Sequence, residues 1–460
     1  MKQITTYKNQ KVLVLGLAKS GANAARLLKK LGALVTANDA KPFDENPEAK
    51  ALVADGIRVI AGSNPVSLLE EDFALVVKNP GIPYSNPLIK AAQAHHIPVI
   101  SEVELAAQVN DAELIGVTGT NGKTTVTTMI TNMLNQDRTV GVAKYAGNIG
   151  VPASQVVQMV GEKDVLVTEL SSFMLAGIQT LHPHIAVITN IYTAHIDWHG
   201  SRDAYVAAKM RITMNQTADD YLVMNWDLPE LRELATQSRA QIIKVSREGL
   251  PETDAYVADG QLMWRGEAIL PVSAINVPGE QNVENALVAL AAAKIAGQTS
   301  EAIARTLRTF AGVRHRLQYV MTYEGRDFYN DSKATDIEAT QMALRGFSRP
   351  IVLLAGGLDR GFTFDRLVDD LKAHVKGVVL FGQTKELLAD AAKKAGITNI
   401  QFAENAPAAV PAAYQMSDEG DIILLSPANA SWDQFPNFEV RGDEYIKAVE
   451  QLTGQKEQHA

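Results

Sequence analysis

The stretch from Leu114 to Thr125, LIGVTGTNGKTT, constrains the fold of this chain more than any other. An apolar run that ends in a glycine-rich turn predicts a buried strand leading into a helix. Backbone N–H groups of such a turn, the helix start, the lysine and a threonine hydroxyl together bind nucleotide phosphates. The general phosphate-loop pattern needs its first glycine at Val117, whereas the glycines are Gly116 and Gly119. The motif alone therefore predicts nucleotide binding in a variant form.

The same change from apolar run to glycine turn occurs from Lys11 to Gly16 and from Arg349 to Gly356. Because further β-branched runs alternate with helix-like segments such as Ala286 to Ala296, we expect parallel sheets covered by helices. A chain of 460 residues is too long for one ordinary core. The fold class predicted is α/β with three domains: a Rossmann-like N-terminal domain (1–110), a central phosphate-loop domain (111–312) and a Rossmann-like C-terminal domain (313–460). Within the central domain, Tyr256 to Ala274 predicts a small hairpin.

Composition excludes several functional classes. The absence of cysteine excludes disulfides and thiolate chemistry, which leaves histidine, lysine and carboxylates as reactive groups. The net charge of -9 and the lack of a basic run interleaved with aromatics argue against nucleic-acid binding. No apolar stretch approaches the roughly 18 residues that span a bilayer, and no signal-peptide core is present. We therefore expect a cytoplasmic protein without membrane insertion or a nucleic-acid partner.

A second glycine motif, Gly16 to Gly21, precedes Asp39 and nearly forms a dinucleotide fingerprint. Ala18 replaces the glycine that lets the backbone approach a pyrophosphate, so ordinary NAD binding is disfavoured. Two alternatives remain for this motif. It is either a structural strand-to-helix turn or the site of another nucleotide-like ligand.

Polar residues follow two apolar runs of the central domain. Glu169 ends one of them, where a carboxylate can hold Mg²⁺ together with Thr124, although a solvated strand-end glutamate is the alternative. His195 follows the other, and the spacing to His199 lacks a metalloprotease glutamate, so zinc is disfavoured. A place beside a phosphate or carboxylate is the preferred role for His195, with a local cap as the alternative. The helical pattern around Lys209 favours a solvated lysine.

Past residue 312, His315-Arg316 and the run from Asp331 to Thr335 collect two basic side chains, a lysine, a carboxylate and two hydroxyls. Arginine pairs bidentately with phosphate, and lysine suits a carboxylate or an acyl phosphate. Either motif could instead cap a helix. Together with the phosphate loop, they predict an anion-handling site assembled between domains.

All these motifs resemble the Mur ligases, ATP-dependent enzymes that form amide bonds in the peptide of bacterial peptidoglycan precursors. The resemblance covers all three predicted domains and explains the displaced glycine as the family's own variant. The run from Ser426 to Gly442 resembles the branch that adds D-glutamate, and the Asp-Asn-Pro-Arg motif associated with diaminopimelate recognition is absent. Further matches are Gly147 to Gly150, Glu169 to Ser172, His195 to Asp197, Lys209, Gly279 to Asn285, His315-Arg316 and Asp331 to Thr335.

The resemblance implies a reaction and its partners. UDP-N-acetylmuramoyl-L-alanine, D-glutamate and ATP are the expected substrates, and the muramoyl carboxylate is expected to attack the γ-phosphate to give an acyl phosphate. The D-glutamate amine then displaces phosphate. Because two anions at about 4 Å repel by roughly 4 kcal/mol at an effective dielectric of about 20, two Mg²⁺ ions are expected. We expect a monomer whose third domain closes onto the second when ATP and the muramoyl substrate bind.

The resemblance also implies roles for individual residues. Thr124 and Glu169 are expected to hold one Mg²⁺, and His195 with a carbamylated Lys209 the other; Lys123 and Lys333 complete the expected catalytic set. Expected nucleotide contacts are Thr118, Gly119, Thr120, Asn121, Gly122, Lys123, Thr124, Thr125 and Asn148, with Asn282 and Asn285 at adenine, His315 and Asp331 at ribose and Arg316 at phosphate. Expected substrate contacts are Ser20, Asp39, Asn79 and Gly81 for uridine diphosphate, Ser171 near phosphate and substrate, and Lys333, Thr335, Arg360, Ser431 and Phe438 for D-glutamate.

Other functions remain possible on sequence alone. Within the same mechanism, the chain could be an alanine-adding or folate-type ligase, which a panel of amino acids would distinguish. A nicotinamide-dependent dehydrogenase built on the first domain would leave the phosphate loop unexplained. A nonenzymatic nucleotide-binding switch is the third alternative.

Overall fold

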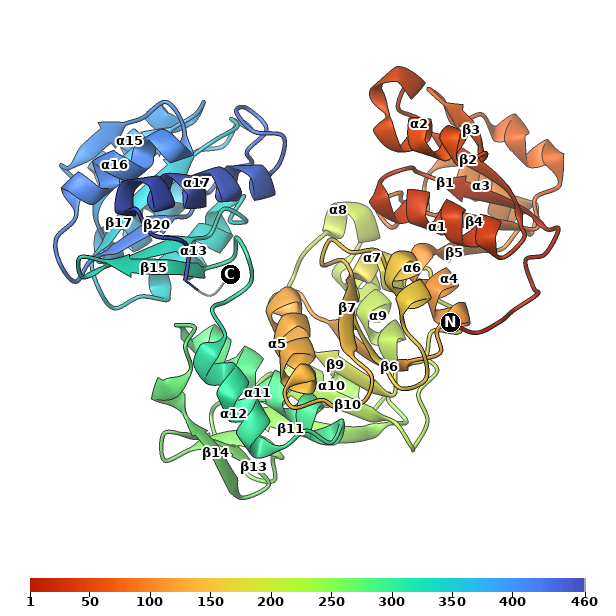
Figure 1. Cartoon of the computed structure of the whole chain (residues 1–460), viewed down its shortest axis with the longest axis horizontal. Helices are drawn as coiled ribbons and strands as arrows, with labels where there is room; N and C mark the ends of the chain where they lie inside the picture. Colours follow the sequence, from red (N-terminus) through yellow and green to blue (C-terminus); the bar gives the residue numbers. More distant parts are fainter. Residues whose placement is uncertain (459–460) are drawn as a thin grey trace. The chain divides into compact units, whose positions relative to one another are not determined.

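The computed structural model describes residues 1–458, without the side chain of Asp197. The chain divides into two compact units (Figure 1). The first unit comprises Met1–Ala274 and Val283–Leu307, and the second comprises Ile275–Asn282 and the described chain from Arg308 onward. Three separate β-sheets, two in the first unit and one in the second, confirm the predicted α/β fold with three domains.

The N-terminal sheet has five parallel strands in the order β3-β2-β1-β4-β5. This order reverses between β1 and β4, and ligands of such sheets bind at the carboxyl ends of the strands beside that switch point. The prediction of a Rossmann-like domain is confirmed. Its elements are β1 (Lys11–Leu15), α1 (Lys19–Lys30), β2 (Leu34–Asp39), η1 (Phe43–Glu45), α2 (Pro47–Ala54), β3 (Arg58–Ala61), η2 (Val66–Glu71), β4 (Leu75–Lys78), α3 (Pro87–Ala94), β5 (Val99–Ser101) and α4 (Glu102–Val109).

The central sheet has nine strands in the order β14-β13-β12-β11-β10-β9-β6-β8-β7. The strands from β7 to β12 are parallel, and β13 and β14 are antiparallel additions at one edge. The hairpin predicted for Tyr256 to Ala274 is therefore confirmed, as three short strands.

The elements of the central domain are β6 (Glu113–Thr118), α5 (Lys123–Asn135), β7 (Ala143–Gly147), α6 (Ala153–Val156), η3 (Val157–Met159), β8 (Val165–Glu169), α7 (Ser172–Leu175), β9 (Ile185–Ile188), α8 (Ile196–His199), α9 (Arg202–Met210), η4 (Arg211–Thr213), β10 (Tyr221–Asn225), α10 (Pro229–Ala235), β11 (Gln241–Ser246), β12 (Ala255–Ala258), β13 (Gln261–Trp264), β14 (Glu267–Pro271), η5 (Val272–Ala274), α11 (Glu280–Ile295) and α12 (Ser300–Thr309).

The C-terminal sheet has six strands in the order β15-β16-β20-β17-β18-β19, and only β15 runs antiparallel to its neighbour. Its elements are β15 (Gln318–Tyr323), β16 (Arg326–Asn330), α13 (Ile337–Arg345), β17 (Ile351–Gly356), η6 (Asp365–Leu367), α14 (Val368–His374), β18 (Val375–Phe381), α15 (Lys385–Lys394), β19 (Ile400–Phe402), α16 (Ala406–Met416), β20 (Ile422–Leu425) and α17 (Phe438–Thr453).

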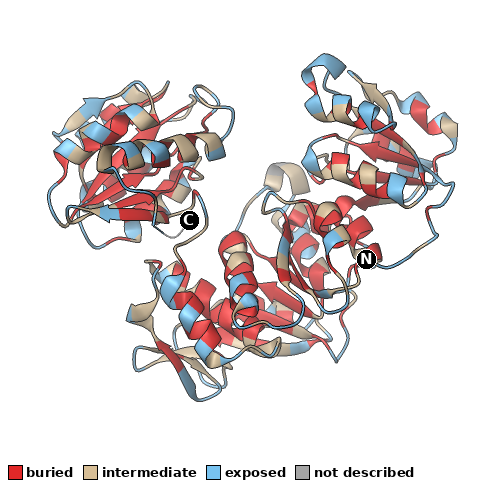
Figure 2. Ribbon diagram, viewed as in Figure 1, coloured by how far each residue is buried: buried red, intermediate tan, exposed pale blue. Residues whose placement is uncertain are grey.

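Strands β8 and β9 of the central sheet and β17 of the C-terminal sheet are buried along their whole length (Figure 2). Strands covered by helices on both faces carry continuous apolar runs rather than alternating ones, which is why β8, β9 and β17 were visible in the sequence. Polar residues that follow these strands are therefore held on a rigid frame. No helix in residues 1–458 is long and apolar enough to cross a membrane.

Candidate functional site

The phosphate loop joins β6 to α5 in the predicted strand-turn-helix form. Gly119 and Gly122 have φ values of 151° and 80°, and Gly122 is the N-cap of α5. A Cβ on Gly122 would lie 2.2 Å from Oδ1 of Asn285 in α11, so a side chain here would have to displace that amide and also adopt a positive φ. The Nζ atom of Lys123 donates to the carbonyls of Gly119 at 3.0 Å and Thr120 at 2.8 Å. The lysine thus lies over the turn that the sequence assigns to phosphate.

Residues after β9 support this loop and were not singled out in the sequence. Asn190 accepts from the Thr120 N–H through its carbonyl and from the Asn121 N–H through Oδ1, both at 2.9 Å. The hydroxyl of Tyr205 lies 2.9 Å from Oγ1 of Thr120. Because β9 pairs with β6 in parallel, residues that follow it reach the same sheet edge, and this signal could have identified Asn190.

Glu169 ends β8 beside the loop and is only 1% exposed, so the solvated alternative is wrong. Its Oε1 accepts from Nδ2 of Asn148 at 2.9 Å, and its Oε2 is buried without a hydrogen-bond partner. A buried carboxylate oxygen is costly when unpaired, and a cation is the natural partner for it.

Lys209 lies in α9 and is 2% exposed, so the solvated lysine that its helical pattern favours is wrong as well. Its Nζ donates to the Gly119 carbonyl at 2.6 Å, which brings the lysine to the phosphate loop. Burial and the nearby charge of Lys123, opposed by Glu169, lower the pKa of Lys209 to about 6. Near neutral pH the amine is therefore largely uncharged, the form that can react with carbon dioxide.

His195 precedes α8 with a φ of 53°. Its ring centre lies 4.9 Å from that of Phe173 and 6.2 Å from that of Tyr205, the residue that contacts Thr120. His195 is the N-cap residue of α8, and its carbonyl accepts from the N–H groups of Trp198 at 3.2 Å and His199 at 3.1 Å, although its side chain makes no capping hydrogen bond; the local-cap alternative therefore holds for its backbone. Among the described side chains, which do not include that of Asp197, no three histidines, aspartates or glutamates are grouped so that they could hold a metal ion.

A cavity of about 430 Å³ lies between the N-terminal and central sheets, within the first unit. Five predicted ligand-contact residues line it: Ser20, Asn79 and Gly81 from the N-terminal domain, with Asn148 and Ser171 from the central domain. Asn79 ties the first group together, because its Nδ2 donates to Oγ of Ser20 at 3.0 Å and its Oδ1 accepts from the Gly81 N–H at 3.1 Å. The structure thus brings the predicted uridine-diphosphate contacts to the predicted substrate contacts.

Asp39 is not among the residues that line this cavity. Its Oδ2 accepts from the Leu17 N–H at 2.5 Å and its Oδ1 from the Lys41 N–H at 2.8 Å, so it holds the turn after β1. A Cβ on Gly21 would lie 1.8 Å from the Gly16 carbonyl oxygen, so this glycine permits the close approach of α1. The second glycine motif therefore has a structural role in the turn.

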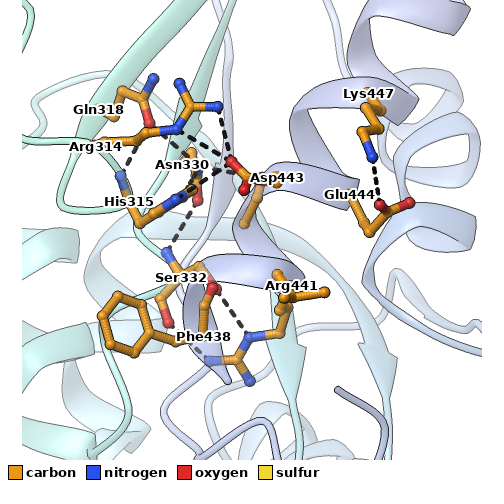
Figure 3. A network of polar contacts seen from close by, with 12 residues as sticks. Arg314, His315, Gln318, Asn330, Ser332, Phe438, Arg441, Asp443, Glu444 and Lys447 are labelled. Carbon is orange, nitrogen blue, oxygen red and sulfur yellow. Dashed lines mark hydrogen bonds and ion pairs between the residues drawn. The ribbon is translucent and has the colours of Figure 1, made fainter. Parts of the chain in front are cut away.

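The second unit holds the C-terminal motifs, and Figure 3 shows the polar network around His315. Nδ1 of His315 accepts from Nδ2 of Asn330 at 2.9 Å, and its Nε2 lies 3.4 Å from Oδ1 of Asp443. Burial lowers the pKa of His315 to about 4, so its imidazole is neutral near pH 7. Burial also raises the pKa of Asp331 to about 7, although this carboxyl accepts from Ser426 Oγ at 2.9 Å.

The predicted D-glutamate contacts lie in the same unit. The Lys333 Nζ is 5.3 Å from the centre of the Phe438 ring, and Arg360 donates to the Thr335 carbonyl at 2.6 Å. The Oγ atom of Ser431 is buried without a partner. The Nε atom of Arg316 is likewise buried and unpartnered. These polar atoms are candidates for ligand contacts, because buried polar groups are ordinarily paired.

Arg441 of α17 holds the C-terminal loops and was missed in the sequence. This buried guanidinium donates to Oγ of Ser332 at 3.0 Å and to the Asn429 carbonyl at 3.0 Å, while Ser332 Oγ donates to the Phe438 carbonyl (Figure 3). A charged residue in a helix is ordinarily expected to be exposed, so the sequence gives no signal that Arg441 is buried.

The remaining predicted nucleotide contacts are divided between the two units. Thr118 is buried and its Oγ1 donates to the Leu170 carbonyl, and Thr124 and Thr125 are buried in the first turn of α5. Asn285 belongs to the first unit, whereas Asn282 belongs to the second, where its Nδ2 donates to the Pro278 carbonyl at 2.6 Å.

Three family models match the chain in order. They are a Mur ligase MurD-like N-terminal domain over residues 10–101, a Mur ligase middle domain over 117–293 and a Mur ligase glutamate ligase domain over 315–429. The curated UDP-N-acetylmuramoylalanine–D-glutamate ligase of Lactiplantibacillus plantarum is 62% identical over 459 residues, covering 100% of both chains. The ligase of the same name from Enterococcus faecalis is 56% identical over 453 residues, covering 98% of this chain and 99% of its own.

Solved structures of lower identity share the fold. The UDP-N-acetylmuramate-alanine ligase MurC of Thermotoga maritima aligns with a TM-score of 0.60 at 18% identity, covering 96% of this chain and 100% of its own. The MurF ligase of Thermotoga maritima, solved in complex with ADP, aligns with a TM-score of 0.57 at 16% identity, covering 98% of this chain and 96% of its own.

Proposed function

Because the chain belongs to the Mur ligase family, we propose that it is the ATP-dependent ligase that joins D-glutamate to UDP-N-acetylmuramoyl-L-alanine in peptidoglycan precursor synthesis. The observation that carries this proposal is the full-length match to D-glutamate ligases at 55–62% identity. It is supported by the half-buried Lys123 and the buried Glu169 and Lys209, which lie together at the phosphate loop. The nicotinamide alternative leaves that cluster unexplained.

The three segments 1–110, 111–312 and 313–460 divide the work in this proposal. The first binds the uridine-diphosphate part of the substrate, the second binds ATP and the third binds D-glutamate. Support comes from the order of the three matched family models and from the cavity that joins Ser20 and Asn79 to Asn148 and Ser171. The protein acts as a monomer in the cytoplasm, where nucleotide-linked precursors are made, and needs no nucleic-acid or membrane partner.

The phosphate-loop edge suits Mg²⁺. Glu169 offers a buried carboxylate oxygen without a partner, Thr124 offers a hydroxyl in the first turn of α5, and a carbamate on Lys209 would offer two more oxygens, the ligands this hard cation prefers. We assign Thr124 and Glu169 to one ion, and His195 and carbamylated Lys209 to a second. Bound Mg²⁺ offsets the repulsion between the muramoyl carboxylate and the triphosphate.

The chain's own residues position the reacting groups. The loop N–H groups from Thr118 to Thr125 and the Lys123 ammonium hold the β- and γ-phosphates while a muramoyl carboxylate oxygen attacks the γ-phosphorus and ADP leaves. Lys333 and Arg360 attract the carboxylates of D-glutamate, and Ser431 and Phe438 orient it. Its amine then attacks the acyl carbon, phosphate departs, and the amine loses a proton as the amide forms.

An amino-acid panel tests the proposal. Purified protein with ATP, Mg²⁺ and UDP-N-acetylmuramoyl-L-alanine should release phosphate with D-glutamate and at background level with L-glutamate, glycine or L-alanine. Omission of Mg²⁺ should abolish release. Equal release without D-glutamate would exclude the proposed specificity, and release with UDP-N-acetylmuramate and L-alanine would favour the alanine-adding alternative.

A further inference from the structure

Two buried glutamates project from the same short helix, α4, with different surroundings. Glu102 and Glu104 are both 0% exposed. Glu104 is fully engaged, because its two oxygens accept from the N–H groups of Gln179, Thr180 and Leu181 at 2.9 to 3.0 Å. Glu104 therefore fastens α4 to the loop before β9, and its role is explained by these bonds.

Glu102 is only half engaged. Its Oε1 accepts from the Ser154 N–H at 2.5 Å, and its Oε2 is buried with no hydrogen-bond partner. A buried polar oxygen without a partner costs free energy, so a second partner is expected in the working protein.

The cavity described above supplies a place for that partner. Glu102 lines it together with Asn79 and Gly81 on the side of the N-terminal domain, and Gly150 and Ser171 on the side of the central domain. These neighbours include the proposed contacts of the muramoyl nucleotide. Glu102 itself has no role in the mechanism proposed above.

The charge state decides what Glu102 can offer. Burial, opposed by hydrogen bonding to Ser154, raises the pKa of this carboxyl, and no charged side chain offsets its burial. An ionised carboxylate would also repel the diphosphate of the proposed substrate. In the neutral form, which avoids both costs, the carbonyl oxygen would accept from Ser154 and the O–H would be a donor.

We infer that Glu102 is a substrate-binding residue that donates a hydrogen bond from its neutral carboxyl to an acceptor oxygen of the muramoyl portion of the substrate. The inference rests on the proposed function. The muramoyl portion is favoured over the diphosphate because the backbone N–H groups at the start of α1, which no side chain caps, are the better partners for an anion.

Steady-state kinetics with three variants test this role. Glu102→Gln keeps an acceptor and a donor, so the KM for UDP-N-acetylmuramoyl-L-alanine should stay within about twofold of the wild type. Glu102→Leu removes both, and that KM should rise about tenfold while the KM for ATP is unchanged. Glu104→Gln, the matched control, should lower the thermal unfolding temperature and leave the KM unchanged. The affinity for UDP alone should be the same in every variant.

Several outcomes would overturn the inference. A Glu102→Leu enzyme with a wild-type KM would reduce Glu102 to a cap on Ser154, and a Glu102→Gln enzyme as weak as the leucine variant would exclude the donor role. Weakened UDP binding would move the contact to the nucleotide. If Glu102→Leu fails to fold, Glu102→Asp withdraws the carboxyl by one methylene and should raise the same KM. Absence of D-glutamate-dependent turnover in the wild type would instead refute the proposed function.

Discussion

Burial determines the chemistry of the charged residues at the phosphate loop. Glu169 and Lys209 are both almost fully buried, one at a strand end and one on a helix. Their sequence contexts alone favour solvated side chains, because local pattern reports the secondary structure of a residue and not what the rest of the fold places over it. The family resemblance supplied the roles that local pattern could not.

Lys209→Ala should reduce D-glutamate-dependent phosphate release by at least about 100-fold, because it removes the proposed metal-binding carbamate. Short-chain carboxylic acids added to this variant should restore part of the activity by supplying the missing oxygens. Lys90→Ala, which removes an exposed helix lysine, is the control and should behave as the wild type. Unchanged turnover of the Lys209 variant would refute the metal role.

At the scale of elements, the sheets and their order of strands and helices follow from local signals, whereas the bonds between elements do not. The strand-turn-helix of the phosphate loop is encoded within one stretch, so it was predictable. Asn190 and Arg441 act on loops distant in sequence, and their contacts exist only once β9 pairs with β6 and α17 covers its sheet. The local structure that carries the predicted site residues was therefore predictable, and the residues that support it from elsewhere in the chain were not.

At the amino ends of β9 and β10 in the central sheet, a carboxyl and two histidines form an acid-sensitive contact. Asp220, which precedes β10, lies 2.7 Å from Nε2 of His182 and 3.1 Å from Nδ1 of His184, and it accepts from the Thr217 N–H at 2.7 Å. Burial acts to raise the pKa of Asp220, but these hydrogen bonds outweigh it and lower the pKa to about 2. The contact is therefore strongest with the carboxyl ionised.

A depressed acid pKa gives stability that is complete well above pH 4 and is lost as the pH falls through the folded pKa, because the unfolded chain binds the proton first. The wild type should therefore lose about 1 kcal/mol relative to Asp220→Asn between pH 5 and pH 3, measured by urea unfolding. Asp219 is an exposed neighbour, so Asp219→Asn is the control. The free energy of unfolding of this variant should change with pH as that of the wild type does. Parallel pH curves for the wild type and Asp220→Asn would contradict the assignment.

At the scale of the whole molecule, α4 fastens the N-terminal domain to the central one. Ser101, just before this helix, donates from its N–H to the Gly177 carbonyl at 3.1 Å, and Glu104 accepts from the following loop. These bonds lie within the first unit, whereas the D-glutamate residues belong to the second. The sequence could predict three domains but could not reveal which of them share a compact unit.

Binding of ATP and the muramoyl substrate should reduce the radius of gyration. The proposed reaction uses Lys123 of the first unit and Lys333 of the second, so ligands are expected to draw the two units together. Small-angle scattering of the free protein and of the protein with a nonhydrolysable ATP analogue, Mg²⁺ and UDP-N-acetylmuramoyl-L-alanine measures this. ATP analogue alone is the reference state, and equal radii for the free and fully liganded protein would count against closure.

The close contact between Gly122 and Asn285 also limits how this site can evolve. A side chain at position 122 would have to displace the asparagine amide and adopt a positive φ, so a substitution there strains the loop before it touches a ligand. An inhibitor that takes its affinity from this corner of the loop would leave the chain few viable escape mutations. The glycine at the proposed phosphate site thus also restricts which mutations could change that site.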